Sequence, residues 1–202
     1  MEIEPNDTLA TATKVGIAKG VVGFTGAVIP YDAAYAEQAF SGVDFLVAFT
    51  EESGQRNMAA LLLGPPAGSI SAVDAGAFEA WQRRSKAGGD RGRPAPLPEA
   101  MVVANAPKLL PLSPSPFGFG VRIQAADAST PPGSQYHVAF VSDAPEGLSG
   151  ALDLATTLIH SQRGRQAQEV LQLAEARFGQ SPQLHELRAL KAESEKLAAG
   201  SP

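Results

Sequence analysis

Val43-Asp44-Phe45-Leu46-Val47-Ala48-Phe49 places a large apolar side chain at every second position. A period of two puts alternate side chains on one face of a β-strand, so the residues expected to share a face are Val43, Phe45, Val47 and Phe49. Similar short runs, rich in Val, Ile, Phe and Ala and bounded by Gly, Pro, Ser or Asp, occur at residues 20–28, 57–63, 119–124 and 136–141. The pattern predicts an antiparallel sheet with one buried face.

The periodicity changes near residue 147. From there on, apolar residues recur three and four positions apart in three segments, which indicates three amphipathic helices. Gly179 stands where a left-handed C-terminal cap is expected, and Ser181-Pro182 offers an N-cap followed by proline at the first helical position. The last two helices are therefore expected to form a tight antiparallel hairpin.

The stretch from residue 64 to residue 101, between the predicted strands, has a weaker pattern. A short helix around Trp81 is expected over residues 77–84, followed by a basic, glycine-rich loop. The sequence thus predicts a β-domain over residues 1–143, with a loop insertion at about 64–100. A helical tail follows over residues 147–198, joined by a segment that forms either a tight corner or a hinge.

Composition excludes several classes of protein. The 202 residues include 16 Lys and Arg against 21 Asp and Glu, for a net charge of -5, and no cysteine. A chain without cysteine is not a disulfide scaffold, a thiolate metal site or a thiol enzyme. An acidic balance argues against nucleic acid as a partner, and no apolar run approaches the roughly 20 residues of a membrane span.

The sequence offers no catalytic constellation. The three histidines, His137, His160 and His185, fall in separate predicted elements without metal-ligand spacing. Neither a Gly-x-Ser-x-Gly turn nor a glycine-rich phosphate loop occurs. The chain is expected not to be an enzyme, with an unrecognised active site as an alternative.

The N-terminal sequence Glu2-Ile3-Glu4-Pro5-Asn6-Asp7 resembles the start of the bacterial pre-peptidase C-terminal domain family. The strands at 20–23, 43–47, 118–123 and 135–141 follow in the family's order, so the resemblance covers about residues 2–142. It implies a mainly β fold, an antiparallel β-sandwich of jelly-roll type, followed here by the small helical segment. It also implies a non-catalytic accessory module of a secreted bacterial protein.

Some members of that family bind calcium through the acidic N-terminal stretch and nearby acidic loops. The positions that match here are Glu2, Glu4, Asn6, Asp7 and Asp44. Carboxylate and carbonyl oxygens are what calcium prefers, and such an ion would stabilise the fold rather than catalyse. In the alternative interpretation, Asn6 or Asp7 caps a short helix. Gly42 departs from the family, which often has aspartate there.

The helical tail resembles a tetratricopeptide-type repeat, which implies docking of another protein. Exposed aromatic residues stack on sugars or anchor partners, and those expected in loops are Tyr31, Tyr35 and Trp81. The expected function is therefore an interaction module of a bacterial envelope, periplasmic or secreted protein, with the signal peptide outside this sequence. A carbohydrate- or matrix-binding module that uses these aromatics is the alternative.

Overall fold

In the residues that it describes, the computed structural model has ten strands and four helices. The described residues are 13–15, 20–25, 43–48, 57–86, 99–103, 106–115, 118–125 and 134–200. Their helices are α2 (Ala75–Lys86), α3 (Ser149–His160), α4 (Gly164–Phe178) and α5 (Leu184–Gly200).

The strands of the described residues form two sheets. Sheet A has the order β1-β3-β9-β5-β6, with β8 also paired to β9, and sheet B has the order β2-β10-β4-β7. The bounds of the sheet A strands are β1 Thr13–Val15, β3 Val43–Ala48, β5 Ser69–Asp74, β6 Glu99–Val103, β8 Pro114–Ser115 and β9 Gly118–Ala125. Those of sheet B are β2 Gly20–Thr25, β4 Met58–Leu63, β7 Pro107–Leu112 and β10 Ser134–Ser142.

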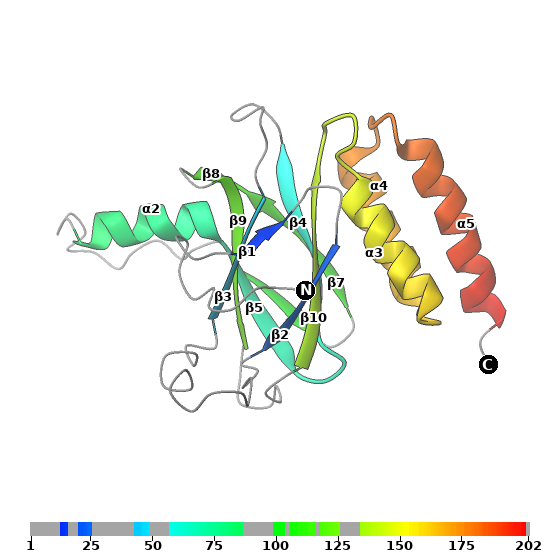
Figure 1. Cartoon of the computed structure of the whole chain (residues 1–202), viewed down its shortest axis with the longest axis horizontal. Coiled ribbons are helices and arrows are strands. Elements are labelled where there is room, and N and C mark those ends of the chain that lie inside the picture. Colours follow the sequence, from blue (N-terminus) through cyan, green and yellow to red (C-terminus); the bar gives the residue numbers. More distant parts are fainter. Residues whose placement is uncertain are drawn as a thin grey trace.

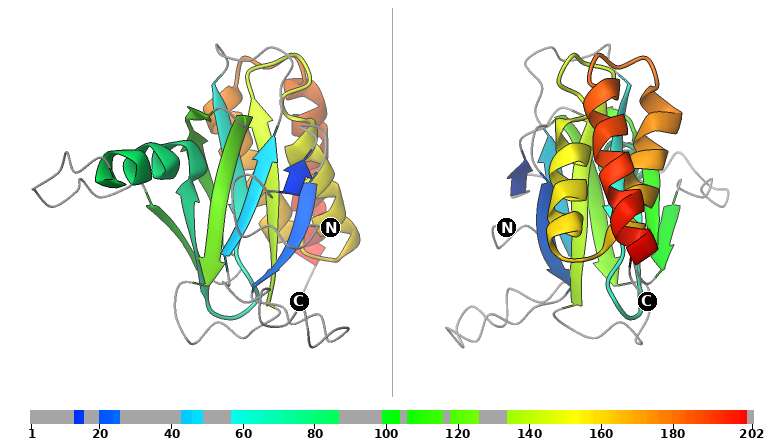
Figure 2. Two further views of the ribbon diagram at one scale, coloured as in Figure 1. Left: turned by 60° about the vertical axis from the view of Figure 1, so that its left-hand side comes forward. Right: turned by 90° about the vertical axis from the view of Figure 1, so that its right-hand side faces the viewer.

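Sheet B is the middle layer of the molecule (Figure 1). One of its faces shares an apolar core with sheet A, and the other shares a second core with the C-terminal helices. Helices α3 and α4 contact sheet B, and α5 packs onto both of them from outside (Figure 2). The layers therefore follow one another as sheet A, sheet B, the α3–α4 pair and α5.

Strand β4 shows why sheet B needs a cover on both faces. All six of its residues are buried. Its even-numbered side chains, Met58, Ala60 and Leu62, enter the core between the sheets. The odd-numbered ones, Ala59, Leu61 and Leu63, enter the core beneath the helices. A strand with no polar face is stable only between two apolar layers.

A tight corner joins β10 to α3. Ser142 donates its N–H to the carbonyl of Gly147 at 2.9 Å, and Gly147 donates to the carbonyl of Ala144 at 2.9 Å. Gly147 is required because a Cβ there would lie 2.2 Å from the carbonyl oxygen of Ser142. The segment is thus a corner and not a hinge, and it directs α3 back along sheet B.

The expected fold class, mainly β with an antiparallel β-sandwich of jelly-roll type, is wrong. The helices hold about as many of the described residues as the strands do, and α3, α4 and α5 cover sheet B instead of forming a minor appendage. Strand β1 also pairs with β3 in parallel. The chain is a layered α/β fold, because the apolar outer face of sheet B is buried by helices.

Two local expectations also need correction, and a third stays a prediction. In β3 the described side chains, Leu46 and Ala48, are buried, whereas those expected to share a face, Val43, Phe45, Val47 and Phe49, lie outside the described side chains. The stretch from 64 to 100 is more than a loop, because it supplies β5, which lies between β9 and β6. Gly179 has φ -62, so it is not a left-handed cap; the left-handed residue near a helix end is Gln162, with φ 58.

Other expectations are confirmed. All five predicted strands are present as β2, β3, β4, β9 and β10, and the alternating apolar residues of β9, Phe119, Val121 and Ile123, are buried. The three C-terminal helices form as predicted, and α2 includes Trp81. The expected start of the last helix is only partly right, because α5 begins at Leu184 and not at Pro182. The Oγ of Ser181 accepts the N–H of Gln183 at 3.3 Å, so Ser181 holds the turn that precedes the helix.

Candidate functional site

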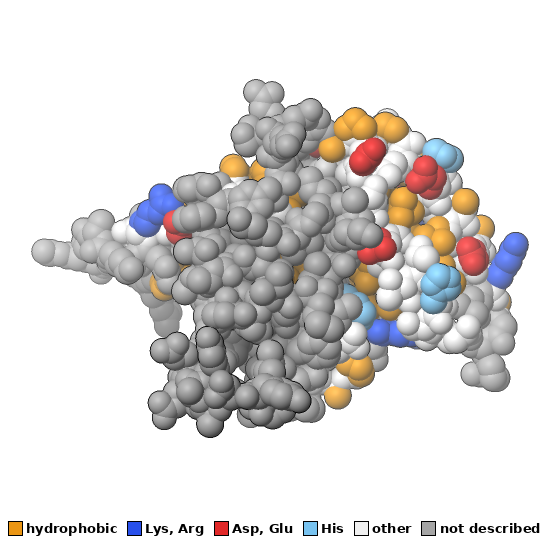
Figure 3. Space-filling model, in the orientation of Figure 1, with side chains coloured by type: hydrophobic (Ala, Val, Ile, Leu, Met, Phe, Trp, Pro, Cys, Tyr) orange, Lys and Arg blue, Asp and Glu red, His pale blue; other side chains and the backbone are white. Residues whose placement is uncertain are grey.

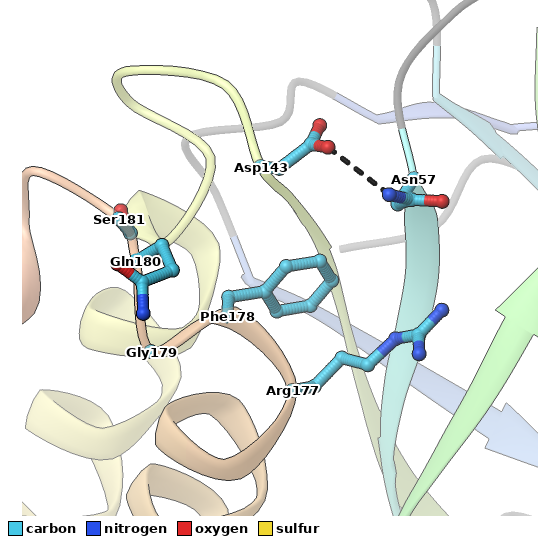
Figure 4. A pocket seen from close by; sticks show the side chains of 7 residues that line it. All are labelled: Asn57, Asp143, Arg177, Phe178, Gly179, Gln180 and Ser181. Atoms are coloured by element: carbon cyan, nitrogen blue, oxygen red, sulfur yellow. Dashed lines mark hydrogen bonds between the residues drawn. The ribbon is translucent and has the colours of Figure 1, made fainter.

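A cavity of about 270 Å³ lies where the end of sheet B meets the turn between α4 and α5 (Figure 4). It lies against two layers of the fold, so it depends on the helices being packed on the sheet. The lining residues are Asn57, Asp143, Arg177, Phe178, Gly179, Gln180 and Ser181.

The sheet contributes Asn57 and Asp143. Asn57 immediately precedes β4 and Asp143 immediately follows β10. The two strands are antiparallel with Ser142 opposite Met58, so the next residue on each strand lies at the same end of the sheet. The Nδ2 of Asn57 donates a hydrogen bond to Oδ2 of Asp143 at 3.2 Å, which orients the carboxylate at the cavity.

The helices contribute Arg177 and Phe178 from the last turn of α4. Phe178 is buried in the core beneath the helices, and its ring forms an apolar wall between the side chains of Asp143 and Arg177 (Figure 4). Arg177 is exposed. In the described part of the chain no ion pair joins Arg177 to Asp143. Opposite charges therefore line one cavity without neutralising each other directly.

Gln183 holds the turn that forms the other wall. Its Oε1 accepts the N–H of Leu148 at 2.8 Å, and its Nε2 donates to Oγ of Ser149 at 2.8 Å. Leu148 is the N-cap of α3 and provides no side-chain cap of its own. One side chain thus supplies an acceptor to a helix N-terminus, which would otherwise have unpaired donors, and fixes the start of α5 against α3.

A second polar cluster joins α4 to α5. Glu175 accepts from Nε of Arg188 at 3.0 Å and from Nζ of Lys191 at 3.1 Å. The hydrogen bonds from Arg188 and then Lys191 lower the pKa of Glu175. Because these groups pair with one another across the helix hairpin, the cluster is structural.

His137 is the buried histidine of the described residues, with an exposed fraction of 6%. It lies in β10 in register with Leu63 of β4. Burial, and to a smaller extent the positive charge of Arg163, lower its pKa to about 4. The imidazole is neutral at pH 7 and is far from the range in which a general base is useful there.

The structure describes two of the residues predicted as sites, Asp44 in β3 and Trp81 in α2, which lie in different elements. The others, Glu2, Glu4, Asn6, Asp7, Tyr31 and Tyr35, lie outside the described residues. Asp44 lies in β3 opposite Ile123 of β9. Within the described ranges no group of three or more His, Cys, Asp or Glu residues is placed to hold a metal ion. The calcium site stays a prediction.

Trp81 lies in helix α2 and not in a loop. It is half-buried and stacks on Phe78, with ring centroids 5.9 Å apart. The guanidinium of Arg122 lies 4.8 Å from the centroid of the Phe78 ring. Phe78 thus joins α2 to β9, and Trp81 stacks on Phe78 within the helix.

The cavity residues were not among the predicted sites. Asn57 and Asp143 lie next to two strands that were predicted from the sequence. What could not be predicted is that these strands pair with each other, which places both polar residues at the same end of sheet B. Arg177 stands two residues before Gly179, at a predicted helix end. Polar residues at the ends of predicted elements were thus the available signal.

Comparison of the chain with known protein families, curated proteins and solved structures gave no match. The resemblance to pre-peptidase C-terminal domains therefore stays a prediction. Among the helices of the described residues, none combines the length and apolar character needed to cross a membrane.

Proposed function

We propose that this chain is a non-catalytic binding module whose recognition site is the cavity between the end of sheet B and the α4–α5 turn. The proposal keeps the interaction role expected from the sequence. It moves the site from the loop aromatics and the outer helical surface to the place where the two layers meet.

One observation carries the proposal: a carboxylate and a guanidinium from different layers line the same cavity without pairing. Ligand sites are concave and combine an apolar wall with a few polar groups in fixed positions. Phe178 supplies the wall, Asn57 fixes the carboxylate, and the turn beside the cavity is held by Gln183. A volume of about 270 Å³ suits a small ligand or one or two side chains of a partner.

The helical surface elsewhere supports the choice of the cavity. On the face that Figure 3 shows, acidic side chains stand singly among apolar and other groups over the helices. The apolar faces of α3 and α4 are already buried against sheet B. We therefore place the docking site at the cavity and not on the faces of the helices.

The test is a binding screen on the full chain. Small amines, carboxylates, zwitterions and neutral compounds are compared by saturation-transfer NMR at millimolar concentration. We expect charged compounds to bind, and Asp143→Asn or Arg177→Gln to weaken that binding about tenfold or more, the loss typical of one charge-assisted hydrogen bond.

Two matched variants serve as controls. Glu146→Gln removes an exposed acid from the same corner, and Arg165→Gln removes an exposed arginine from the other end of α4. Neither residue lines the cavity, so both variants should bind as the parent does. The proposal is wrong if no compound binds, or if the controls weaken binding as much as the cavity variants.

A further inference from the structure

We infer that the cavity takes a small zwitterion of the α-amino-acid class, with the ammonium on Asp143 and the carboxylate on Arg177. This inference rests on the proposed function and names its ligand class.

The two charges define the ligand. A carboxylate binds a cation and a guanidinium binds an anion, frequently through two parallel hydrogen bonds. Both groups line one cavity of about 270 Å³. A ligand that satisfies both must carry opposite charges within a few atoms of each other. An anion would be attracted by Arg177 and repelled by Asp143, and a cation would be attracted by Asp143 and repelled by Arg177. A ligand with one charge would therefore gain one attraction and one repulsion.

The separation of the two groups is compatible with a bridging ligand. In the described residues Asp143 and Arg177 are too far apart for a direct ion pair. Asp143 keeps its orientation through Asn57, so its carboxylate loses little conformational freedom when a ligand binds. Arg177 is exposed, and its long side chain can turn toward the anionic end of a ligand held at Asp143.

The remaining walls set the size and the character of the ligand side chain. The ring of Phe178 is apolar and has an exposed fraction of only 5%, so the part of it that lines the cavity can contact only a small aliphatic group. The cavity is slightly smaller than the roughly 300–1,000 Å³ of pockets for drug-sized ligands. An amino acid with a short aliphatic side chain therefore fits the chemistry better than a peptide or a sugar.

The test uses L-leucine and two analogues that each lack one of its charges. Isoamylamine keeps the ammonium and the side chain, and 4-methylpentanoate keeps the carboxylate and the side chain. Calorimetric titration of the full chain at low salt should show leucine binding about tenfold more tightly than either analogue.

Each substitution should then affect only its own half of the ligand. Asp143→Asn should weaken leucine and isoamylamine but not 4-methylpentanoate, whereas Arg177→Gln should weaken leucine and 4-methylpentanoate but not isoamylamine. Glu146→Gln and Arg165→Gln should change none of the three. Both cavity residues are exposed, and matching melting curves would verify that the variants fold.

The outcomes separate this inference from the proposed function. If leucine binds no more tightly than the better analogue while charged compounds in the screen do bind at the cavity, the zwitterion is overturned and the binding module stands. If no compound binds in either experiment, both are overturned.

Discussion

At the scale of single residues, two glycines at helix ends differ in what they tolerate. Gly147 closes the corner between β10 and α3, where an added Cβ would lie 2.2 Å from the carbonyl oxygen of Ser142. Gly179 follows α4 with φ -62, and an added Cβ would lie 3.1 Å from the carbonyl oxygen of Glu175. The first position requires glycine, whereas the second is only tight.

The two alanine variants should therefore separate. Gly147→Ala must move backbone atoms, so we expect it to lower the free energy of unfolding by about 1–3 kcal/mol, the usual cost of overpacking. Gly179→Ala should cost well under about 1 kcal/mol, since no left-handed conformation is lost. Urea unfolding of both variants checks this, and equal losses would contradict the corner geometry.

His137 makes stability depend on pH. Its pKa is about 4 in the folded chain, below the ordinary value of 6.5. Above pH 6.5 the imidazole is neutral in both states. As the pH falls below 6.5 the unfolded chain binds the proton first, so stability is lost progressively down to about pH 4. The full loss is on the order of 3 kcal/mol.

The measurement is urea unfolding at several values between pH 7 and pH 4. Carboxylates also titrate at the acid end, so the quantity to compare is the difference between the parent and His137→Gln, whose pH dependence should be shallower. His160→Gln removes an exposed histidine and should leave the dependence unchanged. An equal effect of both variants would contradict the burial of His137 as the cause.

At the scale of elements, the start of α5 stabilises the start of α3. Gln183 meets Leu148 and Ser149 from some 35 residues further along the chain. This contact places the α4–α5 turn beside the cavity, so a single side chain links the stability of two helices to the shape of the site.

Gln183→Met should show this link. The change keeps a similar volume but removes both hydrogen bonds, and the expected loss is about 1–2 kcal/mol, as for other N-terminal caps. Gln172→Met alters an exposed glutamine in the middle of α4 and should cost almost nothing. Thermal unfolding of both variants checks the prediction, which fails if they melt alike.

Elements were predictable from the sequence where their patterns were strong and local. The three C-terminal helices and five strands were found because their apolar spacing is regular. Strand β7 was missed because it contains Pro107 and Pro111, which argue against a strand; proline is tolerated there because β7 is an edge of sheet B. Strand β5 was missed because the polar residues Ser69 and Ser71 interrupt its apolar pattern. Both serines are nevertheless buried in the structure.

At the scale of the whole molecule, the layers decide the fold. The uninterrupted apolar run of β4 already indicated a strand buried on both faces, but nothing local showed that the helices supply the second cover. For the same reason the cavity was not predictable, since its two charges lie 34 positions apart and meet only after the helices pack on sheet B.

Removal of residues 148–202 should therefore unfold the remainder. It would expose the odd-numbered face of β4 together with Ala139 and Val141 of β10. Burial of apolar side chains of this size contributes about 1–3 kcal/mol each, and a domain is only marginally stable. We expect the truncated chain to show no cooperative thermal transition by circular dichroism. An unchanged transition would mean that the sheets fold without the helices.

The most direct test of the binding site is amide chemical-shift mapping of the full chain during titration with L-leucine. The account predicts concerted shifts in two separate stretches, one around Asn57 and Asp143 at the end of sheet B and one from Arg177 to Ser181 at the α4–α5 turn. Shifts should be absent around the Arg165–Glu169 pair at the other end of α4. Shifts confined to one layer, scattered over the surface or missing altogether would contradict it.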